Sequence, residues 1–126
     1  MAESLRFHYD VDGDNFTSAG AASVEVKRKL RQLGFPAETI RRVSIAMYEG
    51  EINMVVHARG GVADVFVEPG CITIVLADQG PGIPDVDLAM QEGYSTAPDN
   101  IRALGFGAGM GLPNMKRYTD EMKIDT

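Results

Sequence analysis

Two helical patterns, set end to end, constrain the fold of this chain more than any other feature. From about Asn15 to Leu33, and again from about Ala37 to His57, apolar residues recur at spacings of three and four, as in amphipathic helices. Gly34 supplies a helix stop after the first pattern, and Pro36 stands where a second helix can begin. The second pattern is broader than a narrow stripe, so we expect the second helix to be the more buried.

Three stretches of the chain predict strands. Leu5–Val11 alternates apolar and polar residues, as a half-buried strand does. Val62–Glu68 and Cys71–Ala77 are joined by Pro69 and Gly70, which is a hairpin signal. Because the second arm of this hairpin is almost continuously apolar, we expect it to be central in its sheet.

The last third of the chain has a different character. From Asp78 to Gly111 glycine is frequent and periodicity fades, apart from a short helical pattern over Asp85–Gln91. Long stretches of this kind inside compact domains are usually functional. We expect a final helix over about Gly111–Glu121 and the start of a strand at Met122–Ile124. With 126 residues and no repeat or linker, residues 1–126 are expected to form one α+β domain.

Charge and composition exclude several classes of protein. The net charge of −6 speaks against a sequence-independent nucleic-acid binder, which needs a positive surface. No apolar run approaches the ~18 residues that a membrane span needs, and the N-terminus lacks the order of a signal peptide. The single cysteine, Cys71, cannot form an internal disulfide, which fits a reducing compartment. We therefore expect a cytoplasmic protein without a nucleic-acid or membrane partner.

The first candidate site is a row of polar residues on the second helix. Glu49, Asn53 and His57 are spaced four apart, so they share one helix face. A carboxylate and a carboxamide one turn apart suit a hydrated Mg²⁺ ion, with the carboxylate able to orient a nucleophile. A solvated polar face is the alternative interpretation of this row.

Two neighbours of this row have other expected roles. Gly50 costs the helix about 1 kcal/mol relative to Ala. It therefore indicates either the close approach of another group or a plain packing contact. Glu51 lies about 200° around the helix from Glu49 by the 3.6-residue period, and we expect it to be solvated or paired with Arg41 or Arg42.

Two glycine-rich clusters follow the predicted hairpin. In the first, Asp78 can accept a hydrogen bond from an exocyclic amine, and Gly80 and Gly82 let the backbone approach a flat ring. An ordinary turn is the alternative. In the second, residues 105–112 lead into the final helix, where successive backbone N–H groups can form an anion cradle. A flexible loop is the alternative, and neither a P-loop nor a Rossmann fingerprint is present.

In this order, the three clusters resemble the GHKL or Bergerat-fold superfamily, to which gyrase, Hsp90, bacterial histidine kinases and MutL belong. The matching motifs are Glu49-x-x-x-Asn53, similar to the N box, Asp78-x-Gly80-x-Gly82, similar to the first glycine box, and Gly107-x-Gly109-x-Gly111-Leu112, similar to the second. The resemblance covers about Phe16 to Glu121. It implies a two-layer α/β sandwich, with helices on one face of a mixed, mostly antiparallel sheet.

Within that superfamily the chain looks like the small serine/threonine kinases of bacterial partner-switching modules. Gyrase, Hsp90 and MutL are much longer, and the only histidines here, His8 and His57, do not lie in a dimerisation helix with a phosphoacceptor. The pattern from Gly109 to Glu121 is particularly similar to the switch-kinase branch, which activates a pathway without holding a sigma factor itself.

The resemblance implies a role for each matching residue. Asn53 would hold Mg²⁺, Glu49 would accept the proton of an attacking hydroxyl, and Asp78 would bind the adenine amino group. Further nucleotide contacts would come from His57, Gly80, Gly82, Ile83, Ser95, Thr96, Gly105, Gly107, Gly109, Met110, Gly111 and Leu112.

Some of these assignments have a second interpretation. His57 is equally well a helix-end histidine bonded to backbone. Ser95 and Thr96, in a lid from about Gly93, are equally well polar loop residues. Family members usually continue through a Gly-Thr pair into a last strand, which we expect to be incomplete in this chain.

The resemblance therefore implies a kinase that depends on ATP and Mg²⁺. Its substrate would be a small STAS-type antagonist protein, and a sigma factor or another regulator is a further candidate partner. The alternatives are a non-catalytic, nucleotide-gated binding module and an anti-sigma factor that sequesters a sigma factor. The sequence leaves a homodimer open.

Overall fold

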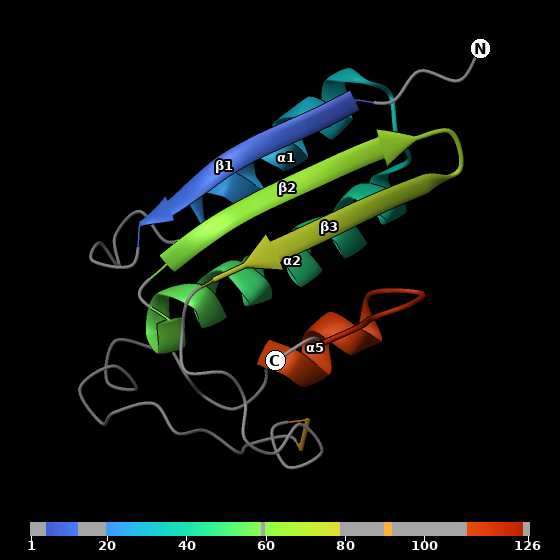
Figure 1. The fold of residues 1–126 in the computed structure, drawn as a ribbon. Coiled ribbons are helices and arrows are strands. Elements are labelled where there is room, and N and C mark those ends of the chain that lie inside the picture. Colours follow the sequence, from blue (N-terminus) through green and yellow to red (C-terminus); the bar gives the residue numbers. More distant parts are fainter. Residues whose placement is uncertain (1–4, 13–19, 59, 79–89, 92–110, 125–126) are drawn as a thin grey trace.

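The computed structural model describes residues 5–12, 20–58, 60–78, 90–91 and 111–124, which form two layers (Figure 1). One layer is a sheet of β1 (Leu5–Asp12), β2 (Gly60–Glu68) and β3 (Cys71–Ala77). The other holds the helices α1 (Ala21–Gln32) and α2 (Ala37–Ala58), which cover one face of the sheet, and α5 (Gly111–Arg117), which lies beside α2. This arrangement confirms the predicted α+β fold.

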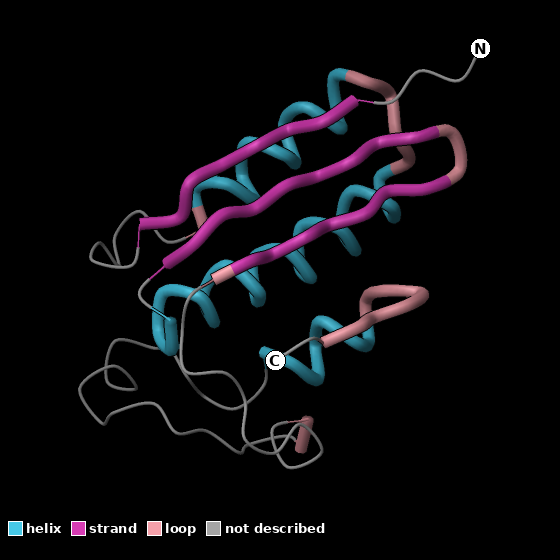
Figure 2. The backbone as a smooth tube through the Cα atoms, in the orientation of Figure 1, coloured by secondary structure: helices cyan, strands magenta, loops and turns pink. Residues whose placement is uncertain are grey.

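The described sheet is antiparallel, in the order β1-β2-β3 (Figure 2). β1 pairs with β2 from Leu5 opposite Val67, and the hairpin pairs β2 with β3 through Val65 opposite Ile74. The prediction that the second hairpin arm is central is wrong among the described strands, because β2 occupies the middle. β3 alternates exposed and part-buried residues, and its Val75 is 45% exposed. Its continuous apolar pattern therefore reflects apolar residues on the outer face rather than burial on both.

The core lies between the inner face of the sheet and the two long helices. The side chains with no exposed surface include Val26 and Leu30 of α1, Met47 of α2 and Val65 of β2. Burying an aliphatic side chain of this size contributes about 1.5–3 kcal/mol, so this layer contact supplies most of the driving force for the fold.

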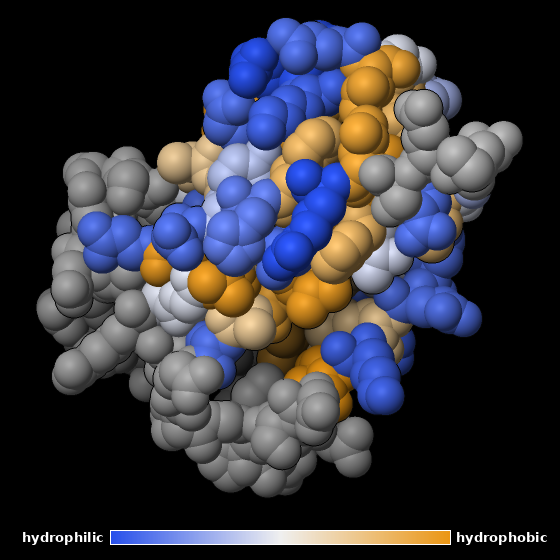
Figure 3. All heavy atoms as spheres, turned by 45° about the horizontal axis from the view of Figure 1, so that its top comes forward, coloured by the Kyte–Doolittle hydropathy of each residue, from blue (hydrophilic) through white to orange (hydrophobic). Residues whose placement is uncertain are grey.

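The outer face of the sheet mixes charged and apolar side chains (Figure 3). Asp64 lies 2.7 Å from His8 Nδ1 and 2.9 Å from a terminal nitrogen of Arg6. The hydrogen bond with His8, followed by that from Arg6, holds the pKa of Asp64 below its ordinary value. Cross-strand polar contacts of this kind suit a face that is not packed against another layer.

Helix bounds differ from the sequence expectation mainly at the ends. α2 matches closely, whereas α1 begins at Ala21, after Gly20 in the left-handed conformation at φ 95°. α5 ends at Arg117, where the Thr119 hydroxyl donates to the carbonyl oxygen of Met115 at 2.8 Å and so supplies a donor that the helix end lacks.

Further predictions concern the region after β3, the C-terminal residues and membrane-spanning helices. The strand expected at Met122–Ile124 is wrong, because these residues adopt no regular secondary structure. The pattern over Asp85–Gln91 lies mostly outside the described residues. Among the described helices, none combines the length and hydropathy required to cross a membrane.

Glu51 is the largest departure from the sequence prediction. It is only 2% exposed and makes no pair with Arg41 or Arg42. Its carboxylate instead accepts hydrogen bonds from the backbone N–H groups of Gly20 at 2.9 Å, Ala22 at 3.2 Å and Ser23 at 3.1 Å, the start of α1. The Glu51 side chain, on the other side of α2 from Glu49, therefore faces the start of α1 and not solvent.

Glu51 is buried here because its carboxylate and the start of α1 satisfy each other's hydrogen-bonding requirements. The first N–H groups of a helix have no partner within that helix, and the aligned peptide dipoles make this end positive. A buried carboxylate requires donors and positive potential. Glycine at the helix start offers no side chain to cap these groups, so Glu51 caps α1 from the neighbouring helix.

We predict that Glu51→Gln lowers the free energy of unfolding by about 2 kcal/mol, since the bonds of a charged acceptor are lost and an amide NH₂ faces backbone donors. Urea denaturation measures this. Glu68→Gln, the same change at an exposed position, is the control and should have little effect. Equal stability of the two variants would contradict the assigned role of Glu51.

Candidate functional site

The site is built on the middle and end of α2. Glu49, Asn53 and His57 follow one another at intervals of four residues along this helix, so they share a face as predicted. Glu49 and Asn53 are both partly buried. His57 belongs to the last turn of the helix, and its side chain lies outside the described part of the chain.

Gly50 brings α2 close to two other elements. A Cβ atom at this position would clash with Leu76 Cδ1 of β3 and lie 3.1 Å from Met115 Cε of α5. Of the two interpretations of this glycine, the described residues show a packing contact. The contact sets the separation of the two layers at the turn that begins with Glu49.

The same contact places the end of β3 beside the site helix. Asp78 directly follows β3 and is exposed. Gly61, at the start of β2, lies close to Ala77 of β3 and Met54 of α2. Asp78 therefore follows the strand end that packs against the Glu49–Asn53 turn, and its role with these two residues stays a prediction.

Asn114 of α5 is the site residue that sequence reasoning missed. Its side-chain amide donates a hydrogen bond to Glu49 Oε1 at 3.4 Å, and both groups are partly buried. The two residues are 65 positions apart. No spacing rule connects them, and the contact exists only because α5 packs on α2.

Polar contacts join the start of α2 to the residues that directly follow α5. Arg42 lies 3.4 Å from Asp120, and the guanidinium of Arg41 stacks 5.3 Å from the centre of the Tyr118 ring. Arg41 also pairs with Glu38 at 2.9 Å, and this hydrogen bond holds the pKa of Glu38 below its ordinary value.

Much of the predicted nucleotide-contacting set lies outside the described residues, namely Gly80, Gly82, Ile83, Ser95, Thr96, Gly105, Gly107, Gly109 and Met110. Gly111 and Leu112 are described as the first two residues of α5. The second glycine cluster therefore leads directly into the helix that supplies Asn114.

The positions of Glu49 and Asn53 suit proton transfer and cation binding. Glu49 is a carboxylate oriented by an amide donor, which suits a proton acceptor. Asn53 presents a carboxamide one turn later, which suits a cation held mainly by other oxygen ligands and water. Within the described part of the chain, no group of three or more His, Cys, Asp or Glu side chains could hold a metal ion by itself.

Comparison with known proteins identifies a matching protein family and several similar proteins. Residues 15–126 match the family described as the histidine kinase-like ATPase domain. The chain is 33% identical over 111 residues to an anti-sigma F factor of Clostridium novyi, covering 83% of this chain and 74% of that protein. It is 31% identical over 102 residues to the serine/threonine-protein kinase RsbT of Bacillus subtilis, covering 76% of this chain and 69% of the kinase.

We predict that Gly50→Ala destabilises the protein by about 1 kcal/mol, although alanine is the better helix former. Overpacking against Leu76 and Met115 costs about 1–3 kcal/mol, which exceeds the ~1 kcal/mol gained in helix propensity. Urea denaturation tests this. In a double-mutant cycle, Leu76→Val should cost less in the Gly50→Ala variant than in the wild-type chain. Additive effects would show that the two side chains do not meet.

Proposed function

The chain belongs to the histidine kinase-like ATPase domain family, and we propose that it is a serine/threonine kinase dependent on Mg²⁺ and ATP. Its proposed substrate is a small STAS-type antagonist protein in a partner-switching system. An ATPase domain implies ATP binding, and one relative is named as a serine/threonine-protein kinase.

The observation that best supports a kinase is the environment of Glu49. This carboxylate is partly buried, stands one turn before Asn53 and accepts a hydrogen bond from Asn114 through Oε1. A carboxylate with one oxygen engaged can present the other to a hydroxyl group. We therefore assign Glu49 as the general base that takes the proton of the attacking serine or threonine.

The other residues position the reactants. Mg·ATP supplies the transferred phosphoryl group and the neutralising charge when it is bound. Asn53 would hold the cation through its side-chain oxygen, and Asp78 would accept a hydrogen bond from the adenine amino group. Asn114 keeps Glu49 in one orientation. In the overall reaction the hydroxyl oxygen gains the phosphoryl group, Glu49 takes the hydroxyl proton and ADP leaves.

The donor set fits a magnesium ion. Mg²⁺ prefers oxygen ligands and keeps several waters, so one or two protein oxygens with phosphates suffice. Asn53 of α2 offers one such oxygen, and the nucleotide phosphates and water would supply the others, which leaves Glu49 free to act as the base. The absence of a three-residue acidic or histidine cluster among the described residues is compatible with an ion shared with a nucleotide.

A second candidate function is sequestration of a sigma factor. The relative from Clostridium novyi is named an anti-sigma F factor, and this observation favours the alternative. Co-purification of a sigma factor with the chain would promote it over the switch-kinase assignment. A nucleotide-gated binding module without catalysis is distinguished by unchanged mass of every partner incubated with ATP.

We predict that Asn53→Ala weakens binding of Mg·ATP by about tenfold or more, because an interaction with a charged group is lost. Calorimetric titration with ATP and ADP measures this. Removal of Mg²⁺ should weaken binding to the wild type and have a smaller effect on the variant. Thr73→Ala, on the outer face of the sheet, serves as the control. Equal affinities for Asn53→Ala and wild type would remove Asn53 from the site.

We predict that Glu49→Gln lowers the rate of phosphate transfer to a cognate antagonist protein about 100-fold or more, because a general base is lost. Binding of ATP should remain nearly intact. Intact-mass measurement of the antagonist follows the transfer. Glu68→Gln, at the exposed end of β2, is the matched control. Undiminished transfer by Glu49→Gln would exclude Glu49 as the base.

A further inference from the structure

A groove runs between α1 and α2 on the side away from the sheet. It consists of two hollows of about 320 and 290 Å³ that share Lys27, Ser44 and Ile45. We call it the interhelix groove and define it by Val24, Lys27 and Arg31 of α1 and by Ile45, Tyr48 and Glu49 of α2. Glu49, the proposed base, lies at one end.

Two cations that have no carboxylate partner among the described residues line this groove. Lys27 and Arg31 are one turn apart on α1, and both are exposed. Neither pairs with a carboxylate in the described part of the chain, whereas Arg28 on the same helix pairs with Glu25 at 2.8 Å. The whole chain has a net charge of −6, so this local positive charge is opposite to the overall balance.

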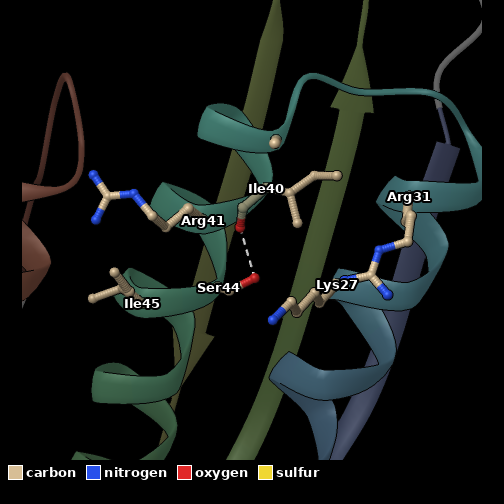
Figure 4. Close-up of a pocket in the computed structure, with 7 residues that line it drawn as sticks. Lys27, Arg31, Ile40, Arg41, Ser44 and Ile45 are labelled. Atoms are coloured by element: carbon tan, nitrogen blue, oxygen red, sulfur yellow. Dashed lines mark hydrogen bonds between the residues drawn. The ribbon is translucent and has the colours of Figure 1, made fainter.

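The side-chain directions keep the cations in the groove. In Figure 4, Lys27 extends from α1 toward Ser44 of α2, and Arg41 points away from α1. The Ser44 hydroxyl is engaged within its own helix, since it donates to the carbonyl oxygen of Ile40 at 2.6 Å. Of the described residues that line the two hollows, Glu49 alone carries a carboxylate. The middle of the groove is therefore suited to an anionic group.

The end of the groove nearest Glu49 is apolar. Val24 is 67% exposed and Tyr48 is 42% exposed, and both line this end. Exposed apolar side chains beside unpaired cations are the complement of an amphipathic surface that carries carboxylates. From Ile40 to Glu49, α2 rises about 14 Å, which is the length of about nine residues of a docked helix.

We propose that the interhelix groove docks an acidic, amphipathic helix of the protein substrate. Carboxylates of that helix contact Lys27 and Arg31, and its apolar side chains cover Val24 and Tyr48. A third helix suits the furrow between two packed helices, because its side chains interdigitate with theirs. The direction toward Glu49 rests on the proposed kinase function, since the docked helix then brings a neighbouring hydroxyl to the base.

Titration of the ¹⁵N-labelled chain with a synthetic peptide tests the proposal by NMR. The probe is a helix of about 14 residues with a glutamate stripe beside a leucine stripe, and glutamine replaces glutamate in the comparison peptide. We expect saturable shifts at Lys27, Arg31, Ile45 and Tyr48 with the acidic peptide. We expect much weaker shifts with the glutamine peptide. Raising the salt from about 50 to about 300 mM should weaken binding.

Charge reversal supplies the matched comparison. Lys27→Glu combined with Arg31→Glu should weaken peptide binding about fivefold or more. Arg28→Glu, an exposed change on the same helix outside the groove, should leave it within about twofold. Because all three positions are exposed, the variants should fold, and the amide spectrum verifies this.

The outcomes separate this proposal from the kinase assignment. Absent shifts, shifts centred elsewhere, or equal binding of both peptides would overturn the docking site. The same shifts produced by inorganic phosphate alone would also overturn it, in favour of a simple anion site. Peptide binding in the groove without phosphate transfer by the wild-type chain would instead contradict the kinase function and leave the groove as a docking surface.

Discussion

A buried carboxylate joins the two long helices of this protein. Glu51 of α2 accepts hydrogen bonds from the backbone N–H groups of Gly20, Ala22 and Ser23, at the start of α1. The helix start needs acceptors and the buried carboxylate needs donors, so each satisfies the other. Because Glu51 is two residues from Glu49, these hydrogen bonds also orient the turn of α2 on which the candidate site is built.

Two sequence-distant elements, β3 and α5, pack against α2 next to Glu51. At Gly50 the helix approaches Leu76 of β3 and Met115 of α5 closely enough that no larger residue fits without movement. One residue earlier, Glu49 accepts the hydrogen bond from Asn114. Glu49 therefore lies between the sheet edge and α5 on one side and the interhelix groove on the other. In the proposed function, these two sides correspond to the nucleotide and the protein substrate.

The sequence predicted the fold class and α2 closely, because hydrophobic periodicity is a local property that survives packing. It also predicted the row of Glu49 and Asn53, since helical spacing alone places them on one face. Among the described strands it failed for β3, whose apolar outer face resembles the pattern of a central strand, and it failed for the strand expected at Met122–Ile124. The glycine-rich positions between Gly80 and Met110 stay predictions, as they lie outside the described residues.

The sequence by itself determined the two long helices, the β2–β3 hairpin, the family motifs and the helix face that holds Glu49 and Asn53, because all of these depend on spacing along the chain. Only the tertiary structure decided that Glu51 is buried as the cap of α1 and that Asn114 contacts Glu49. It also decided that Lys27 and Arg31 line a groove ending at the proposed base. Such contacts join residues from different elements, and their partners are chosen by how the layers pack.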